Sequence, residues 1–197
     1  MGMDKAELRL GSQTFLERIV DGLQGLCAPI VLVGEVNRSR HQLPESIPVI
    51  PDEAAGRGPL EGIRVGLKHL DQLECSAALV TSCDAPLLKP AVIHRLRESL
   101  RTGAAVVPVL GPRKFGLTAI YRCDQWRIVE AQIARQALRV MDLAEAMNAQ
   151  LIDAEKFRDV DPDLLSLTNV NSKDDYFRLL EESGESCPAH LAERLRS

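Results

Sequence analysis

The chain has 197 residues and a net charge of −4, and 45% of its residues are hydrophobic while 26% are charged. This length suits one ordinary domain, and the composition is that of a globular protein able to bury a substantial core. No basic face stands out and no apolar run approaches the ~20 residues that span a bilayer. We therefore expect neither nucleic acid nor a membrane as a partner.

The cysteines indicate a reducing environment. There are five of them, an odd number, and no two form a C-x-x-C pair. A disulfide framework or a thiol-rich metal site is not indicated by this pattern, so the sequence predicts a cytoplasmic protein.

Hydrophobic periodicity predicts helices and strands in alternation along the chain. Thr14, with Glu17 three residues later, forms a capping-box pattern ahead of the first helical stripe. Continuous apolar runs bounded by Gly or Pro predict strands that are covered on both faces. Helices are expected at residues 14–26, 59–73, 91–100, 124–134, 139–147 and 173–182, and strands at 30–33, 47–50, 77–81, 104–109, 117–121 and 151–152.

This alternation predicts an α/β fold, with a three-layer, mostly parallel, doubly wound sheet. We expect one domain over residues 1–182 and a polar tail over residues 183–197. One feature is unusual for such a fold, because the first predicted element is a loop followed by a helix. A parallel α/β domain ordinarily opens with a strand, so the sequence predicts a sheet that lacks its first strand.

Ligands of open α/β sheets bind outside the carboxyl ends of the strands, so residues that directly follow strands are candidates for function. Asp84 follows the predicted strand at 77–81, within Ser-Cys-Asp-Ala-Pro. A carboxylate there suits a hard cation such as Mg²⁺, which takes few protein ligands and completes its shell with phosphate and water. The alternative is that Asp84 only caps the next turn.

Two further candidates lie between the predicted strand at 47–50 and the helix that follows. Asp52 lies at the same sheet edge and suits contact with a base or ribose, although an unrelated loop acid is the simpler reading. Gly58 opens the helix within G-R-G-P-L-E-G. Free N–H groups at such a helix start can bind an anion or the edge of a nucleotide. The glycine spacing does not match a dinucleotide-binding fingerprint.

Lys5 and a pair of asparagines complete the candidate set. A lysine in the loop before the first helix can act as a compact charge on phosphates, although a solvated lysine is the commoner role. Asn169 and Asn171 precede the last helix. We expect Asn171 to cap that helix with Asp174 at the third helical position, and the two amides together can also face a ligand or metal. The scattered histidines predict neither a zinc site nor a nucleophile triad.

Taken in order, these segments resemble the molybdenum cofactor guanylyltransferases and their nucleotidyltransferase relatives. M-G-M-D-K-A at residues 1–6 resembles the second half of the signature L-A-G-G-x-S-x-R-M-G-x-D-K. G-P-L-E-G-I at 58–63 resembles the G-P-L-x-G turn, and S-C-D-A-P at 82–86 resembles P-C-D-x-P. N-V-N-S-K-D-D at 169–175 resembles the N-[IV]-N-T-P-E-[DE] ending. Each motif is weak alone, but their shared order is specific and covers residues 1 to about 180.

The resemblance implies an Mg²⁺-dependent enzyme that transfers GMP from GTP to molybdenum-molybdopterin, which gives molybdopterin guanine dinucleotide and pyrophosphate. It implies that Lys5 contacts the phosphates, Asp84 binds the metal, and Asp52 and Gly58 hold the nucleotide. Asn169 and Asn171 would then contact the metal or the pterin. Molybdoenzymes or molybdenum insertion proteins would be further partners. Nucleotidyl transfer needs alignment and charge neutralisation rather than a protein nucleophile, which agrees with the absence of a triad.

Two departures from the family pattern leave alternatives open. The L-A-G-G-x-S-x-R half of the signature, whose N–H groups would bind phosphates, is not in this chain. We expect that the natural protein starts upstream of Met1 and that the chain as given binds GTP weakly. Gly34 stands where a polar nucleotide contact is usual, which weakens the choice of GTP over CTP. The alternatives are a cytidylyltransferase for the same pterin, a sugar-phosphate nucleotidyltransferase, and a non-catalytic nucleotide-binding homologue.

Overall fold

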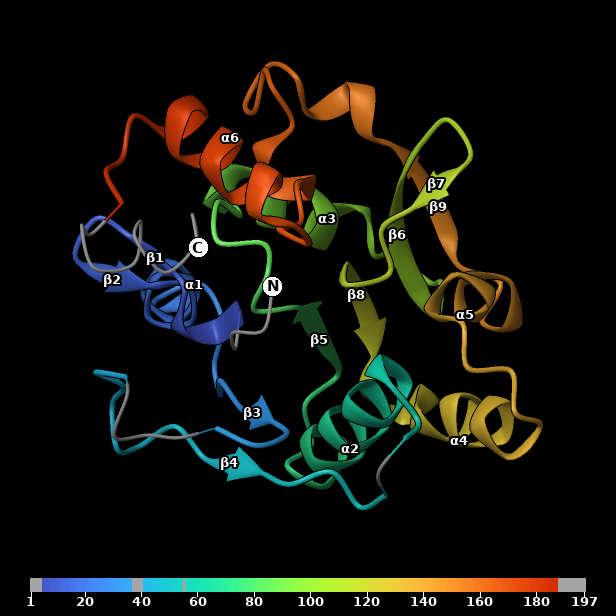
Figure 1. The fold of residues 1–197 in the computed structure, drawn as a ribbon. Helices are drawn as coiled ribbons and strands as arrows, with labels where there is room; N and C mark the ends of the chain where they lie inside the picture. Colours follow the sequence, from blue (N-terminus) through green and yellow to red (C-terminus); the bar gives the residue numbers. More distant parts are fainter. Residues whose placement is uncertain (1–4, 37–40, 55, 188–197) are drawn as a thin grey trace.

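The computed structural model describes residues 5–36, 41–54 and 56–187, so the first four motif residues lie outside the described part (Figure 1). The helices are α1 Phe15–Leu23, α2 Pro59–Gln72, α3 Pro90–Ser99, α4 Trp126–Ala134, α5 Val140–Ala146 and α6 Lys173–Ser183. The strands are β1 Arg9–Leu10, β2 Gln13–Thr14, β3 Leu32–Val33, β4 Val49–Ile50, β5 Ala77–Thr81, β6 Ala105–Leu110, β7 Arg113–Lys114, β8 Thr118–Arg122 and β9 Gln150–Asp153. No helix among the described residues is long and apolar enough to cross a membrane.

Helix α1 begins as the sequence predicts. The Thr14 side chain accepts a hydrogen bond from the Glu17 backbone N–H, and the Glu17 carboxylate accepts one from the Thr14 N–H. This reciprocal pair satisfies two of the N–H groups that a helix start leaves without partners. The short hairpin ahead of it was not predicted. Strands β1 and β2 pair across a two-residue turn in which Gly11 has a φ of 59°.

The main sheet has the strand order β5-β8-β6-β7, with β9 pairing on β6. The three-layer α/β fold is confirmed, but the strand directions are more mixed than predicted. Strand β8 runs antiparallel to both β5 and β6, whereas β9 runs parallel to β6. The short connection from β6 through β7 to β8 explains this, because a parallel pair needs a crossover of a dozen or more residues.

Alternating residues of the central strands pack against helices on opposite faces of the sheet. Ala105 and Val107 of β6 join a core cluster with residues of α2, α4 and α5. Val106, between them, joins a different cluster with α3 and with the segment around Phe157. This period of two is the pattern of a strand buried on both faces, and it produces the middle layer of a three-layer domain.

Strands β3 and β4 form a separate pair. They run parallel, with Leu32 opposite Val49 and Val33 opposite Ile50. Within the described residues this pair is not hydrogen-bonded to β5, so the sheet is interrupted between β3 and β5. Helix α2 contacts both β3 and β5 and therefore spans the interruption (Figure 1).

Candidate active site

Asp84 lies just beyond the carboxyl end of β5, where the sequence predicts it. Its carboxylate Oδ1 accepts a hydrogen bond from the Ser82 hydroxyl, and its side chain is 14% exposed. The turn is closed by a hydrogen bond from the Ala85 N–H to the Ser82 carbonyl at 3.3 Å. Ser82 therefore orients the Asp84 carboxylate. The sequence alone did not identify this role.

Lys5 lies against Asp84 although 79 positions separate them in the chain. The Lys5 Nζ is 3.3 Å from the Asp84 Oδ2 and donates a second hydrogen bond to the Asn171 Oδ1 at 2.7 Å. The Lys5 side chain is one-third exposed, so its ammonium group faces solvent on one side. The sequence motifs pointed to three separate segments, which are η1 (Lys5–Glu7), the turn after β5 and the residues before α6. In the structure these three segments meet at one point.

The cap of α6 differs from the prediction by one residue. Ser172 caps the helix, with Asp175 at the third helical position, and each side chain bonds the backbone N–H of the other. Asp175 also accepts a hydrogen bond from the Asn171 backbone N–H at 3.0 Å. Because Ser172 does the capping, the Asn171 amide is available to Lys5. The prediction that Asn171 caps with Asp174 is wrong.

The backbone before α6 is bound directly to the β5 turn. The Val170 N–H donates to the Asp84 carbonyl at 2.9 Å, and the Val170 side chain is fully buried. Asn169, its neighbour, is half-buried, and the described structure shows no hydrogen bond from its side chain. Asn171 therefore contacts the cluster, whereas Asn169 lies beside it without a contact.

Asp52 and Gly58 lie in the segment between β4 and α2. Asp52 is exposed after β4, and no described contact joins it to Lys5 or Asp84. Gly58 precedes α2 with a φ of 60°, a conformation that favours glycine, and Pro59 occupies the first turn of the helix. Pro59 borders the same cavity as Asp84, so the start of α2 and the β5 turn face a common space.

A buried ion-pair network holds the first turns of α2, and the sequence analysis missed it. Arg64 and Glu61 are 3% and 1% exposed, and the Arg64 Nη2 is 2.8 Å from the Glu61 Oε1. The Arg64 Nη2 also contacts the half-exposed Glu53 at 2.7 Å, and Arg57 contacts Glu61 at 3.3 Å. Hydrogen bonds from Arg64 lower the pKa of the Glu61 carboxyl despite its burial. The i, i+3 spacing of Glu61 and Arg64 on α2 is the sequence signal from which this ion pair could have been predicted.

The sequence analysis also missed Asp161, which is fully buried. Asp161 binds Lys89, which lies in the segment between the Asp84 turn and α3. Its Oδ1 forms an ion pair with the Lys89 Nζ at 2.8 Å, and its Oδ2 accepts from the Ser166 N–H at 2.9 Å. The Ser166 hydroxyl in turn accepts from the Lys89 N–H at 2.9 Å. Nothing in the local sequence distinguishes Asp161 from a surface turn acid, because its partners are distant in the chain.

We expect Asp161→Asn to destabilise the protein by about 1–3 kcal/mol at pH 7, because the substitution removes the negative charge that pairs with the Lys89 ammonium. Burial raises the pKa of the Asp161 carboxyl, but Lys89 and Ser166 outweigh burial and hold it below the ordinary 3.8. This stabilisation is present above about pH 4 and is lost as the pH falls through the lower, folded-state value. Urea unfolding of both proteins between pH 3 and 7 measures it. An identical pH dependence in the variant would contradict the assignment.

The residues present fit one hard cation at Asp84. Among the described residues, no group of three or more His, Cys, Asp or Glu side chains lies together, which argues against a cage made only of protein ligands. Mg²⁺ is ordinarily held by one or two carboxylates and by phosphate oxygens and water, so a single oriented carboxylate beside a lysine is sufficient.

The fold and this cluster define a nucleotidyltransferase-type α/β enzyme, and comparison with known proteins agrees. Residues 1–150 match the MobA-like NTP transferase domain. The sequence is 34% identical to the probable molybdenum cofactor guanylyltransferase of Mycobacterium tuberculosis, over 87% of this chain and 83% of that protein. It is 27% identical to the protein of the same name from Pelotomaculum thermopropionicum, over 89% of this chain and 83% of that one. The chain belongs to the MobA-like NTP transferase family.

Two solved structures support the fold. The molybdopterin-guanine dinucleotide biosynthesis protein A from Archaeoglobus fulgidus aligns with a TM-score of 0.75 at 24% identity, over 93% of this chain and 92% of that one. The 2-C-methyl-D-erythritol 4-phosphate cytidylyltransferase from Thermus thermophilus aligns with a TM-score of 0.64 at 15% identity, over 91% and 93%. The expected α/β nucleotidyltransferase fold is therefore confirmed.

Proposed function

We propose that this enzyme transfers GMP from GTP to molybdenum-molybdopterin, which yields molybdopterin guanine dinucleotide and pyrophosphate. The observation that carries the proposal is the meeting of Lys5, Asp84 and Asn171 at the carboxyl end of β5. The choice of guanine and of the pterin is supported by the names of the relatives, which are probable molybdenum cofactor guanylyltransferases.

The reaction needs no covalent bond to the protein. A phosphate oxygen of molybdopterin attacks the α-phosphorus of GTP, the bond from that phosphorus to the β-phosphate oxygen breaks, and pyrophosphate leaves with the bonding electrons. Negative charge grows on the phosphate oxygens as this happens. In our proposal the Lys5 ammonium neutralises part of it, and Ser82 holds the Asp84 carboxylate in position.

The remaining residues would orient the two substrates. When bound at Asp84, Mg²⁺ supplies positive charge to the phosphate oxygens. Backbone N–H groups at the start of α2, next to Gly58, would bind the edge of the nucleotide, with Asp52 near the base or ribose. Asn171, and Asn169 beside it, would face the pterin or the metal. We propose that this activity is cytoplasmic and that molybdoenzymes or molybdenum insertion proteins receive its product.

The experiment that tests the function is an assay with each nucleotide. Purified protein is incubated with molybdenum-molybdopterin, Mg²⁺ and either GTP or CTP, and pyrophosphate and the dinucleotide are both measured. We expect product with GTP and little with CTP. Product with CTP alone would reject the guanylyl assignment, and nucleotide binding with no turnover would identify a non-catalytic homologue.

We expect Lys5→Ala to lower kcat/KM for guanylyl transfer by about 10²-fold, which is the size of effect seen when one preorganised charge-stabilising donor is removed. Stability should change little, because the Lys5 side chain is one-third exposed. Steady-state kinetics measures the first effect and thermal unfolding the second. Lys114→Ala is the matched control, since Lys114 forms a comparable ion pair with Glu145 away from the cluster. Equal activity in both variants would remove Lys5 from the mechanism.

A further inference from the structure

A groove of about 510 Å³ lies between α4 and α5. None of the described residues that line it borders the cavity at Asp84, so it is separate from the candidate active site. Figure 1 shows α4 and α5 next to each other, on the side of the molecule opposite α1 in this view. The groove is lined by Arg127, Ile128, Ala131, Gln132, Arg135, Ala137, Asp142 and Ala146. Its volume lies within the range of about 300–1,000 Å³ that is usual for ligand sites.

Small side chains keep the middle of this groove open. Ala131 of α4, Ala137 of the connection and Ala146 of α5 line it, and both helical alanines are exposed. Larger apolar side chains stand next to them in the chain, since Leu138 is 39% exposed and Met141 is 38% exposed. Apolar surface that gathers around a groove is typical of a site that binds another molecule. The middle of the groove therefore suits one apolar side chain of a ligand.

Gln132 forms part of the groove lining and has one acceptor without a partner. The residue is only 7% exposed, and its Nε2 donates to the Ala137 carbonyl at 2.9 Å and to the Arg139 carbonyl at 3.0 Å. These two bonds fix the orientation of the amide. The Gln132 Oε1 is buried and has no hydrogen-bond partner among the described residues. Buried polar atoms are ordinarily paired, so a ligand that brings an N–H donor into the groove would satisfy this oxygen.

Two arginines at the ends of α4 give the groove positive charge. Arg127 lies in the first turn of α4, and Arg135 directly follows its last residue. Neither forms an ion pair with a described residue, whereas the surface residues Arg95 and Arg158 each pair with a carboxylate. The Arg127 guanidinium lies over the Trp126 ring, 4.4 Å from its centroid, which limits its movement. In a chain with a net charge of −4, two such arginines beside one groove favour an anionic ligand.

An acidic peptide matches this groove better than a nucleotide or a lipid chain does. Asp142 lines the α5 side, and its carboxylate would repel the phosphates of a nucleotide. A lipid chain would fill the apolar middle but would bring no N–H donor to Gln132. A peptide supplies carboxylates for the arginines, an apolar side chain for the alanines and backbone N–H groups for Gln132 and Asp142. The peptide must be extended, because a helix uses its backbone N–H groups internally.

We infer that the groove between α4 and α5 binds an extended segment of a partner protein, in which an acidic, an apolar and a second acidic residue occupy alternate positions. Arg127 and Arg135 are eight positions apart, which is about 12 Å along a helix. An extended chain rises about 3.3 Å per residue, so acidic side chains four positions apart span about 13 Å and point to the same side. The apolar side chain midway between them also points to that side and meets the alanines.

The test measures binding of a labelled peptide to the full chain. The probe is fluorescein-Gly-Ser-Glu-Thr-Leu-Thr-Glu-Ser-amide, and fluorescence anisotropy at low salt gives its dissociation constant. We expect a micromolar value that rises by about 10-fold or more in Arg135→Glu, which reverses one charge, and in Ala131→Trp, which fills the middle of the groove. Of the two probes with a single Glu replaced by Lys, one should bind Arg135→Glu more tightly than it binds the native protein. Thermal unfolding checks that both variants are folded.

Arg101→Glu is the matched control, because Arg101 is exposed, forms no ion pair with a described residue and does not line the groove. It should leave the affinity unchanged.

Three outcomes would overturn the proposal. The first is no binding of the probe to the native protein. The second is equal binding of a probe with its two Glu residues adjacent, which would show that charge alone is recognised. The third is a dimer of the native protein, detected by sedimentation, that Arg135→Glu dissociates, because the groove would then be occupied by a second copy. None of these measurements involves nucleotide transfer, so the result is independent of the proposed function.

Discussion

Asp84→Ala should reduce kcat/KM for nucleotidyl transfer by about 10³-fold, which corresponds to roughly 4 kcal/mol of transition-state stabilisation. The proposed ligand of Mg²⁺ is lost, and the Lys5 Nζ loses one of its two hydrogen-bond partners. The fold should survive, because the Lys5 ammonium that loses this partner is one-third exposed and can bond to water instead. We expect the free energy of unfolding to change by no more than about 1 kcal/mol. Kinetics and urea unfolding of the same preparation measure both effects.

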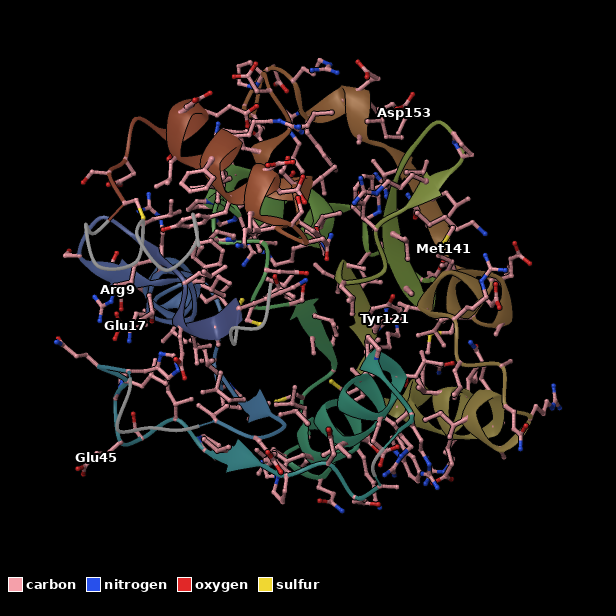
Figure 2. All side chains as sticks on the ribbon, in the orientation of Figure 1. Arg9, Glu17, Glu45, Tyr121, Met141 and Asp153 are labelled. Carbon is pink, nitrogen blue, oxygen red and sulfur yellow. The ribbon has the colours of Figure 1, made fainter. Side chains whose placement is uncertain are left out.

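A second aspartate at a strand end provides the control for Asp84. Asp153 is the last residue of β9, and its carboxylate caps the following turn by accepting from the Glu155 N–H at 3.0 Å. Figure 2 shows Asp153 at the periphery, on the side away from β3 and β5. Asp153→Ala should cost about 1 kcal/mol of stability and leave the kinetics unchanged. If Asp84→Ala behaves as Asp153→Ala does, Asp84 is a turn cap and not a metal ligand.

Arg64→Met is expected to have the largest effect on stability, about 3–5 kcal/mol at pH 7. Arg64 and Glu61 are almost completely buried, so removal of the guanidinium leaves the Glu61 carboxylate inside the protein. Its remaining contact is Arg57 at 3.3 Å, whose side chain is 42% exposed and therefore partly screened by water. A loss of this size approaches the ~5–15 kcal/mol that stabilises a whole domain. Urea unfolding at pH 7 measures it.

The double variant Arg64→Met with Glu61→Leu separates the two possible causes of this loss. If the cost arises from a buried unpaired carboxylate, removal of both charges should restore most of the stability. Hydrogen bonds from Arg64 lower the pKa of Glu61 below its ordinary 4.5, so in the native protein this pair stabilises above about pH 4.5 and weakens as the pH falls. The difference between native protein and Arg64→Met should therefore shrink in acid. A double variant as unstable as the single one would contradict this explanation.

Local sequence was sufficient to predict the α-helices and the longer strands, although not the two-residue strands β1, β2 and β7. The apolar run at residues 77–81 is β5 with the predicted bounds, and α2 begins at Pro59 as predicted. The capping box of Thr14 and Glu17 is also present. These features depend on neighbours within a few residues, through hydrogen bonds, a restricted proline φ and hydrophobic periodicity. The ordered motifs likewise placed the chain in its family, which the match over residues 1–150 confirms.

The position of Asp84 also followed from the sequence, because a residue after a buried strand lies at the edge of the sheet. Its meeting with Lys5 and Asn171 required the fold, since 79 and 87 positions separate them from it. The sequence suggested that Asn171 caps α6, but Ser172 does so and Asn171 bonds to Lys5. Two adjacent residues can each cap a helix at similar cost, so only the tertiary contact decided between them.

The strand directions and the buried charges were decided by the tertiary structure alone. A run such as residues 118–122 predicts a strand but carries no information about its neighbours. The short path from β6 through β7 makes β8 antiparallel, and β5 then pairs with β8. The partners of Asp161 and the burial of Arg64 likewise depend on which segments pack above them. Propensity and periodicity act over one turn or one strand, whereas pairing and burial arise from contacts between segments far apart in the chain.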